Sequence, residues 1–220
     1  MQMKERLAHK SNYTAMNGRK IEYIVIHYTG NDGDTAAGNC NYFAEANRNA
    51  SAHYFVDENE VWRSVEDKNK AWHCGGDVYY HNKCRNTNAI GIELCSRKKN
   101  GKYYFEDETI KNAVELTKSK MQEYGIPLEN VVRHYDVTHK NCPAPFVKNL
   151  VAWENFKTML GDDLGMIYKT YKDVPESFKP TIKKLIDKGA LKGDANGNLN
   201  LPHEIIRLYV VHDRMGVYDK

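Results

Sequence analysis

The sequence contains no apolar run that could cross a membrane, because a spanning helix needs roughly 20 consecutive apolar residues and no run comes near that length. Residues 1–17 are polar and lack the apolar core of a secretory signal peptide. We therefore expect a chain that is made in the cytoplasm and has no membrane partner. If it works outside the cell, a route other than a signal sequence must release it.

A large excess of one charge sign is also missing. The 220 residues include 32 Lys and Arg and 29 Asp and Glu, which gives a net charge of +3. Proteins that bind nucleic acid usually carry a concentrated basic stripe, so the composition predicts no nucleic-acid partner, while attraction to an acidic polymer stays open. The cysteines number five, an odd count, and without a secretory signal free thiols or metal ligands are expected.

Strand and helix signals alternate after a polar segment, residues 1–20, that we expect to form a loosely held arm. The β-branched run at residues 21–30 (IEYIVIHYTG) predicts a strand buried on both faces. Residues 88–96 predict another strand, whose alternation places Ile90 and Glu93 on opposite faces. A strand at 131–134, a hairpin at 51–63 and helices at 34–47, 107–124 and 146–160 complete a pattern that predicts an α/β fold with a central mixed β-sheet flanked by helices.

The chain after residue 160 has a different pattern. Residues 161–165 predict a linker, and helices are expected over residues 175–188 and 202–215. We therefore expect two domains, residues 1–160 and a small helical C-terminal domain of residues 161–220.

Two of the predicted strands end in histidines, His27 and His134, and Cys142 follows eight residues after His134. Two imidazoles and a thiolate suit Zn²⁺, and three protein ligands leave the fourth tetrahedral position open, as in catalytic zinc sites. A water molecule activated there has a pKa of about 7 and is a nucleophile at neutral pH. With nine histidines and five cysteines in the chain, other combinations compete with this one.

The long loop at residues 67–88 carries such a competing set. His73, Cys74, His81 and Cys84 could close a structural zinc knuckle, although adjacent side chains rarely converge on one ion. A disulfide between Cys74 and Cys84 would be the alternative in an oxidising setting.

Separated motifs also occur in a fixed order along residues 20–160. In this order and spacing they resemble the zinc N-acetylmuramoyl-L-alanine amidases of the type-2 amidase and peptidoglycan-recognition superfamily, which includes phage endolysins. The motifs are residues 23–29 (YIVIHYT), 51–56 (SAHYFV), 71–73 (AWH), 88–93 (NAIGIE), 132–136 (VRHYD) and 140–143 (KNCP).

The resemblance implies that His27, His134 and Cys142 bind Zn²⁺. It implies a substrate, the amide between the lactyl group of N-acetylmuramic acid and L-alanine in peptidoglycan. Glu93 matches the catalytic glutamate of these amidases, and Lys140 matches a lysine that faces the developing oxyanion in some members. Amide hydrolysis independently requires a group that moves a proton and a positive charge near the oxyanion.

The resemblance also implies substrate-binding residues. His73 matches a substrate or oxyanion contact in members with a Trp-His pair, and Trp72 is a candidate for the groove wall. His53 stands where one branch carries tyrosine, so we interpret it as an auxiliary polar group, and Tyr28 begins the wall of the groove. Ordinary structural roles are the alternative for each of these residues, as for Glu93 and Lys140.

Residues 171–198 resemble a single degenerate surface-layer-homology unit, which suggests binding to the cell wall. The resemblance fails at residues 203–207 (HEIIR), and a helical cap or a homo-oligomer contact is the alternative. Residues 194–198 (DANGN) resemble a calcium loop but lack its later glutamate, so we interpret them as a turn.

Together these features predict a peptidoglycan hydrolase of the endolysin or autolysin kind, released to the wall through a holin or by lysis. One alternative is a cytosolic amidase that recycles soluble muropeptides. Another is a non-catalytic peptidoglycan-recognition module. Members of that kind typically lack the cysteine ligand, and Cys142 is present here.

Overall fold

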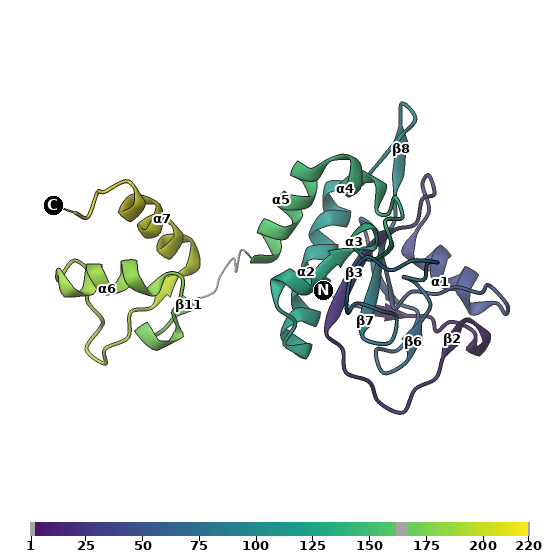
Figure 1. Ribbon diagram of the computed structural model, residues 1–220, viewed down its shortest axis with the longest axis horizontal. Helices are drawn as coiled ribbons and strands as arrows, with labels where there is room; N and C mark the ends of the chain where they lie inside the picture. Colours follow the sequence, from purple (N-terminus) through teal and green to yellow (C-terminus); the bar gives the residue numbers. More distant parts are fainter. Residues whose placement is uncertain (1–2, 162–166, 220) are drawn as a thin grey trace. The chain divides into compact units, whose positions relative to one another are not determined.

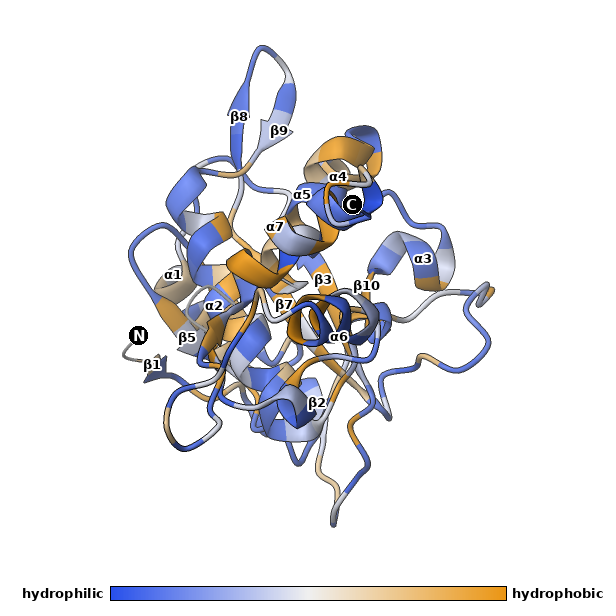
Figure 2. Ribbon diagram, turned by 90° about the vertical axis from the view of Figure 1, so that its left-hand side faces the viewer, coloured by the Kyte–Doolittle hydropathy of each residue, from blue (hydrophilic) through white to orange (hydrophobic). Residues whose placement is uncertain are grey.

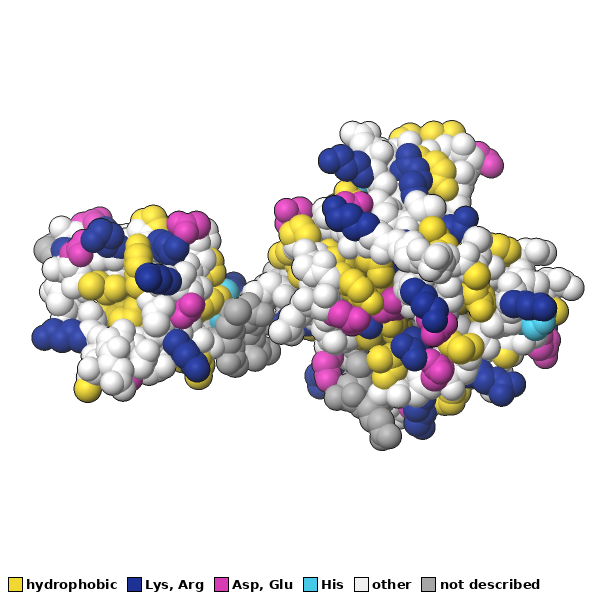
Figure 3. Space-filling view, turned by 90° about the horizontal axis from the view of Figure 1, so that it is seen from below, with side chains coloured by type: hydrophobic (Ala, Val, Ile, Leu, Met, Phe, Trp, Pro, Cys, Tyr) yellow, Lys and Arg dark blue, Asp and Glu magenta, His cyan; other side chains and the backbone are white. Residues whose placement is uncertain are grey.

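The computed structural model describes residues 3–161 and 167–219, and Figure 1 shows their arrangement. The chain divides into two compact units, Met1–Leu160 and Gly161–Lys220. Residues 162–165 of the predicted linker lie outside the described part of the chain. None of the described helices combines the length and the apolar character needed to span a membrane. On the face seen in Figure 3, acidic and basic side chains are interspersed in both units.

A six-stranded mixed sheet with the order β1-β5-β4-β7-β3-β10 forms the centre of the first unit, which confirms the predicted α/β fold. Strand β3 (Tyr23–Tyr28) lies parallel to β7 (Ala89–Leu94) and to β10 (Val131–Arg133). Strand β4 (Tyr54–Val56) is parallel to β7 and forms the predicted hairpin with β5 (Val61–Arg63). The parallel strands therefore end at one edge of the sheet, where loops can build a site.

The two faces of the sheet have different covers. Ile24 and Ile26 pack with residues of α2 (Asp107–Tyr124) and α5 (Leu150–Gly161) in the main apolar core. Val25 packs in a separate cluster on the opposite face. All three side chains are buried because both faces are covered. Figure 2 shows this concentration of hydrophobic residues on β3 and β10.

The N-terminal segment is ordered, so the prediction of a loosely held arm is wrong. Strand β1 (Met3–Glu5) extends the sheet beside β5, and a 3-10 turn, η1 (Lys10–Asn12), follows. Strand β2 (Tyr13–Thr14) pairs with β6 (Lys70–Ala71). The Arg19 guanidinium then donates hydrogen bonds to the carbonyl oxygens of residues 67, 86 and 89, so one arginine ties this segment to the loop at residues 67–88.

Helix boundaries follow local chemistry. Helix α1 (Ala36–Ala44) begins after Thr35, whose hydroxyl accepts from the Gly38 amide, and α2 ends at Gly125, which has a φ of 63°. The helix predicted over residues 146–160 is two helices, α4 (Ala144–Lys148) and α5. Asn149 is extended between them and its side chain accepts from the Ala152 amide, which is the action of an N-cap.

Two further elements differ from the prediction. Strands β8 (Arg97–Lys99) and β9 (Lys102–Tyr104) form a hairpin that the sequence analysis missed. Its turn residues Asn100 and Gly101 both have positive φ, and an Asn-Gly pair is the sequence signal for this turn. After the 3-10 turn η2 (Leu128–Asn130) and β10, His134 does not end the strand but begins helix α3 (His134–Thr138).

The second unit has its own small core. Strands β11 (Ile167–Tyr168) and β12 (Leu201–Pro202) pair antiparallel, and a 3-10 turn, η3 (Tyr171–Asp173), follows the first. Helices α6 (Lys179–Asp187) and α7 (His203–Arg214) are shorter versions of the two predicted helices. The buried residues that form the core are Tyr168, Val174, Ile182, Leu201 and Ile206.

A buried ion pair joins α2 to the loop after β5. The Lys120 ammonium lies 2.8 Å from an Asp67 carboxylate oxygen, and the side chains are 7% and 9% exposed. The hydroxyls of Tyr54 and Tyr124 also donate to Asp67. Removing one member of such a group leaves an uncompensated buried charge, which costs about 3–5 kcal/mol.

We therefore expect Lys120→Met to lower the free energy of unfolding by about 3 kcal/mol. Urea unfolding followed by tryptophan fluorescence would measure it, since Trp62, Trp72 and Trp153 all lie in the first unit. Lys111→Met is the matched control, because Lys111 pairs with Glu108 on the exposed surface of the same helix, where an ion pair contributes little to stability. Equal effects of the two variants would contradict the buried role.

Candidate metal centre

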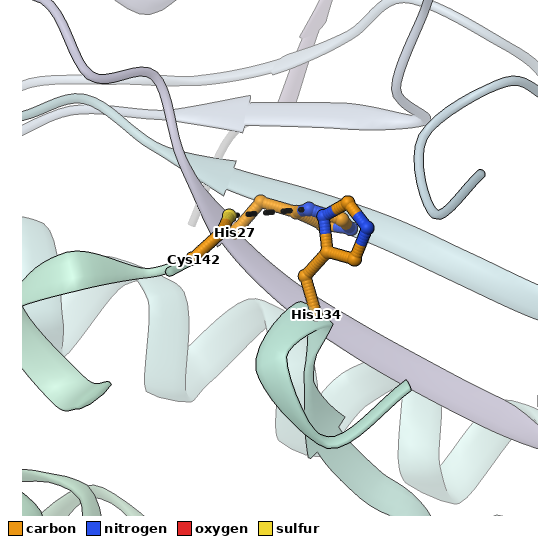
Figure 4. A group of neighbouring side chains, drawn as sticks. All are labelled: His27, His134 and Cys142. Carbon is orange, nitrogen blue, oxygen red and sulfur yellow. Dashed lines mark hydrogen bonds between the residues drawn. The ribbon is translucent and has the colours of Figure 1, made fainter. Parts of the chain in front are cut away.

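Three potential metal ligands converge beside the carboxyl end of β3. His27 stands on β3, His134 is the first residue of α3, and Cys142 lies in the loop before α4. One ligand atom from each residue lies within 4.8 Å of the other two, and all three side chains are buried. Figure 4 shows them pointing toward one another from a strand, a helix and a loop.

The atoms that face each other suit a metal ion. Cys142 Sγ lies 3.6 Å from His27 Nδ1, and the His27 and His134 ring centroids are 4.7 Å apart. Neither ring nitrogen of His134 makes a hydrogen bond of standard geometry, although the backbone of Gly75 lies near enough to influence its pKa. Two nitrogens and a sulfur with unmet bonding capacity are the donors that Zn²⁺ takes, so the residues fit a three-ligand zinc site.

Burial controls the protonation of these ligands. Burial, with smaller contributions from His134 and His73, lowers the pKa of His27 well below its ordinary value. Burial, followed by the charge of Lys140, lowers the pKa of His134 to about 4. Both imidazoles are therefore neutral at pH 7, which is the form that binds metals. Burial raises the pKa of Cys142 to about 12, so its thiolate forms only when a cation compensates the charge.

Glu93 stands beside the metal ligands because β7 pairs with β3 in a register that sets Glu93 opposite His27. Its carboxylate Oε1 lies 3.9 Å from His27 Nδ1, and the side chain is 18% exposed. Burial raises the pKa of Glu93 to about 8, and the positive charge of Lys140 opposes the shift. A carboxyl with a pKa near neutrality can both accept and release a proton.

Glu93 and Lys140 open onto a cleft of about 680 Å³, hereafter the first cleft. Tyr28 also lines it, while its predicted place in the wall of a substrate groove stays a prediction. Its other lining residues are mostly polar or aromatic: Thr29, Asn31, Asp34, Gly38, Asn39, Tyr42, Phe43, Ala50 and Phe55. The structure thus brings a carboxyl group and a cation to one cleft, and the potential metal ligands lie buried beside that carboxyl group.

His73 lies behind the metal ligands. Its Nδ1 is 3.0 Å from His27 Nε2, while His27 Nδ1 faces Cys142. A hydrogen bond from His27 Nε2 to His73 leaves Nδ1 free as the metal-binding atom. His73 therefore lies against His27 and is not among the residues that line the first cleft.

The absence of a side chain at Gly91 leaves room for the His73 ring. A Cβ atom on Gly91 would lie 2.5 Å from the His73 ring, so only glycine leaves room for the ring above β7. The sequence analysis did not single out Gly91, although a glycine inside a predicted strand signals a close approach of another group.

His53 and Trp72 occupy structural positions. His53 has no exposed surface, its Nδ1 accepts from the Gly91 amide, and its Nε2 lies 3.2 Å from the Asn69 carbonyl oxygen. With both nitrogens bonded inside the protein, it does not supply the predicted substrate contact. The Trp72 indole donates to the Thr14 hydroxyl at 2.9 Å, and Trp72 is not among the residues that line the first cleft.

The competing zinc knuckle does not form. Within residues 3–161 and 167–219, His27, His134 and Cys142 are the one group of three potential ligands that comes together. His81 Nδ1 accepts from the amides of Lys83 and Cys84, so it points into its own loop. Cys74 and Cys84 are buried free thiols, as are the other three cysteines.

Comparison with known proteins identifies relatives of the chain. The family model for N-acetylmuramoyl-L-alanine amidase matches residues 17–145. A probable N-acetylmuramoyl-L-alanine amidase of Bacillus licheniformis is 36% identical over 66% of the chain and 42% of its own length. The amidase CwlL of Bacillus licheniformis is 32% identical over 77% of the chain and 49% of its own length. The chain thus spans less than half the length of these curated relatives.

Solved structures agree with the sequence relatives. The catalytic domain of XlyA superposes with a TM-score of 0.61 at 28% identity, covering 73% of the chain and all of that domain. The overlap therefore corresponds in extent to one catalytic domain.

The contact between His73 and His27 predicts that His73→Ala weakens Zn²⁺ binding by about 10- to 100-fold, the usual effect of losing a group that orients a metal ligand. Competition with a chromophoric chelator would measure the Kd. His81→Ala is the control, since His81 lies in the same loop but its ring bonds to the amides of that loop and packs on Tyr23 rather than on His27. If His73 contacts substrate instead, the variant will keep its zinc affinity and show a raised KM.

Proposed function

Because this chain belongs to the N-acetylmuramoyl-L-alanine amidase family, we propose that it is a zinc-dependent peptidoglycan hydrolase that cleaves the amide between N-acetylmuramic acid and L-alanine. The observation that carries the proposal is the buried group of His27, His134 and Cys142 next to Glu93 and Lys140. The family match supports the substrate, and the donor set supports the metal.

In the proposed mechanism, His27 Nδ1, a ring nitrogen of His134 and Cys142 Sγ would hold a zinc ion. When bound, Zn²⁺ is a Lewis acid that makes a water molecule nucleophilic at neutral pH. His73 accepts the hydrogen of His27 Nε2 and so keeps Nδ1 directed at the site. The neutral state of both imidazoles agrees with this role, since protonated rings cannot bind a metal.

Glu93 moves the proton. Its carboxylate takes a proton from the attacking water and delivers it to the nitrogen of the leaving L-alanine, and its raised pKa suits both steps. Lys140 lines the same cleft and provides a positive charge for the oxyanion that forms at the scissile carbonyl. Glu93 and Lys140 both line the first cleft, and the potential ligand His27 lies beside Glu93, so an amide bound in that cleft can reach the proton-transfer group and the positive charge together.

We propose wall attachment as the role of the Gly161–Lys220 unit, supported by its separate core and by the resemblance of residues 171–198 to a surface-layer-homology unit. Exposed Leu208 and Val211 on α7, and Met215 directly after it, make self-association the alternative. Sedimentation of the full chain, with and without isolated cell walls, would separate the two roles.

Cys142→Ala should remove zinc and abolish the release of L-alanine amino termini from peptidoglycan, because two imidazoles alone hold the ion poorly. Metal analysis and an amino-terminus assay on intact sacculi and on soluble muropeptides would measure both effects. Cys40→Ala removes a buried thiol far from the ligands, in the cluster around α1, and should keep metal and activity. Undiminished hydrolysis by Cys142→Ala would refute the zinc mechanism.

Glu93→Gln should keep zinc but lower kcat by about 10²- to 10⁴-fold, since the amide preserves shape and loses the proton-transfer group. Steady-state kinetics together with metal content would separate chemistry from binding. Glu108→Gln, on the surface of α2, is the control for removal of one negative charge. A near-wild-type rate in Glu93→Gln would remove Glu93 from the mechanism.

A further inference from the structure

A second cleft, of about 770 Å³, adjoins the first one at Tyr28, which lines both. Asn141, the residue before the potential ligand Cys142, also lines the second cleft. A substrate whose scissile bond lies at Glu93 can therefore extend past Tyr28 into it. The mechanism above makes no use of this space.

The missed hairpin forms one wall of the second cleft. Tyr103 on β9 packs edge-on against Tyr28, with ring centroids 5.5 Å apart, and Lys98 on β8 lies 5.3 Å from the centre of the Tyr103 ring. Lys148 and Ala144 on α4 line the opposite wall. In Figure 1 the hairpin labelled β8 projects near α4. The β8–β9 hairpin and α4, which are about 40 residues apart in the sequence, thus form the cleft together with the ring pair of Tyr28 and Tyr103.

The two clefts differ in charge. The first contains the carboxyl groups of Asp34 and Glu93 along with Lys140. The second is lined by three lysines, Lys98, Lys102 and Lys148, and by no acidic side chain. The carboxylates that bond to the hairpin are engaged there: Asp32 accepts from the Lys98 backbone amide, and Glu106 accepts from the Tyr104 hydroxyl.

The three lysines are available for a ligand. Among the described residues, none of the three forms an ion pair. Lys111 and Lys120 on α2, in contrast, both pair with acidic side chains. Like-charged ammonium groups gathered around a concave surface attract an anion and strengthen its hold. Such a surface recognises carboxylate or phosphate oxygens.

The charges of the proposed substrate match this division. A glycan strand of N-acetylated sugars is uncharged where its lactyl group is held in the amide, whereas a stem peptide carries at least its terminal carboxylate. Resting on the proposed function, we infer that the second cleft is the subsite for the carboxylate-bearing stem peptide, on the side of the leaving amine. The first cleft then takes the muramoyl side, where Asn31 and Asn39 offer amides to sugar hydroxyls.

The test compares two soluble muropeptides that differ only in whether the stem-peptide carboxylates are free or amidated. We expect Lys102→Gln combined with Lys148→Gln to lower the ratio of kcat/KM for the free acid over the amidated substrate by about three- to tenfold, mainly through KM. Lys102→Glu with Lys148→Glu should reverse the preference. The matched control is Lys99→Gln, on the same hairpin but outside the cleft, which should keep the wild-type ratio.

The outcomes are distinguishable. If the wild-type protein hydrolyses neither muropeptide, the proposed function fails. If it hydrolyses both and the lysine variants keep the wild-type ratio, the activity stands and the stem-peptide subsite is refuted. A second result also refutes the subsite. In it, the variants keep that ratio but bind walls that carry phosphate polymers more weakly than the wild-type protein does, while binding to acid-extracted walls is unchanged. The lysines would then bind phosphate groups rather than the stem peptide.

Discussion

Strands β3 and β7 pair in parallel along six residues, and this pairing sets His27 directly opposite Glu93. Because side chains alternate along a strand, the same register sends Ile24, Ile26 and their partners on β7 into the main core. A slip of one residue would move Ile24 and Ile26 out of the main core and turn His27 toward it, away from His134 and Cys142. The position of the chemical groups therefore depends on the burial of residues that take no part in the chemistry.

The metal centre concentrates buried polar atoms whose bonding is incomplete. Both ring nitrogens of His134, Nε2 of His73 and one oxygen of Glu93 have no hydrogen-bond partner within the described residues. A buried polar group without a partner costs about 1–3 kcal/mol, so this site weakens the fold that carries it. Apolar packing and the Lys120–Asp67 pair offset that cost, and a bound cation would add its binding free energy to the stability of the fold.

The residues proposed to select the substrate and the residues proposed to act on it lie on different elements of the fold. The proton-transfer group and the potential ligands lie at the ends of strands that the core holds rigidly. The lysines of the second cleft lie on an exposed hairpin and on the short helix α4, outside the main sheet. The exposed hairpin tolerates sequence change because few buried contacts depend on it, which suits the proposed role of its lysines in selecting a substrate, whereas Phe146 anchors α4 in the main core.

Local sequence patterns were sufficient for the α/β fold, the β4–β5 hairpin and the end of α2 at Gly125, whereas the group of His27, His134 and Cys142 was one of several combinations until the family resemblance singled it out. Strand alternation, helix caps and ligand types act over a few residues, so they can be read without coordinates. The turn at Asn100 and Gly101 and the cap at Asn149 carried equally local signals.

Tertiary structure alone decided that His73 contacts His27, that His53 is buried and that a lysine-lined cleft adjoins Tyr28. Those outcomes depend on contacts between segments far apart in the chain, where burial and side-chain direction are set by the packing of the whole domain.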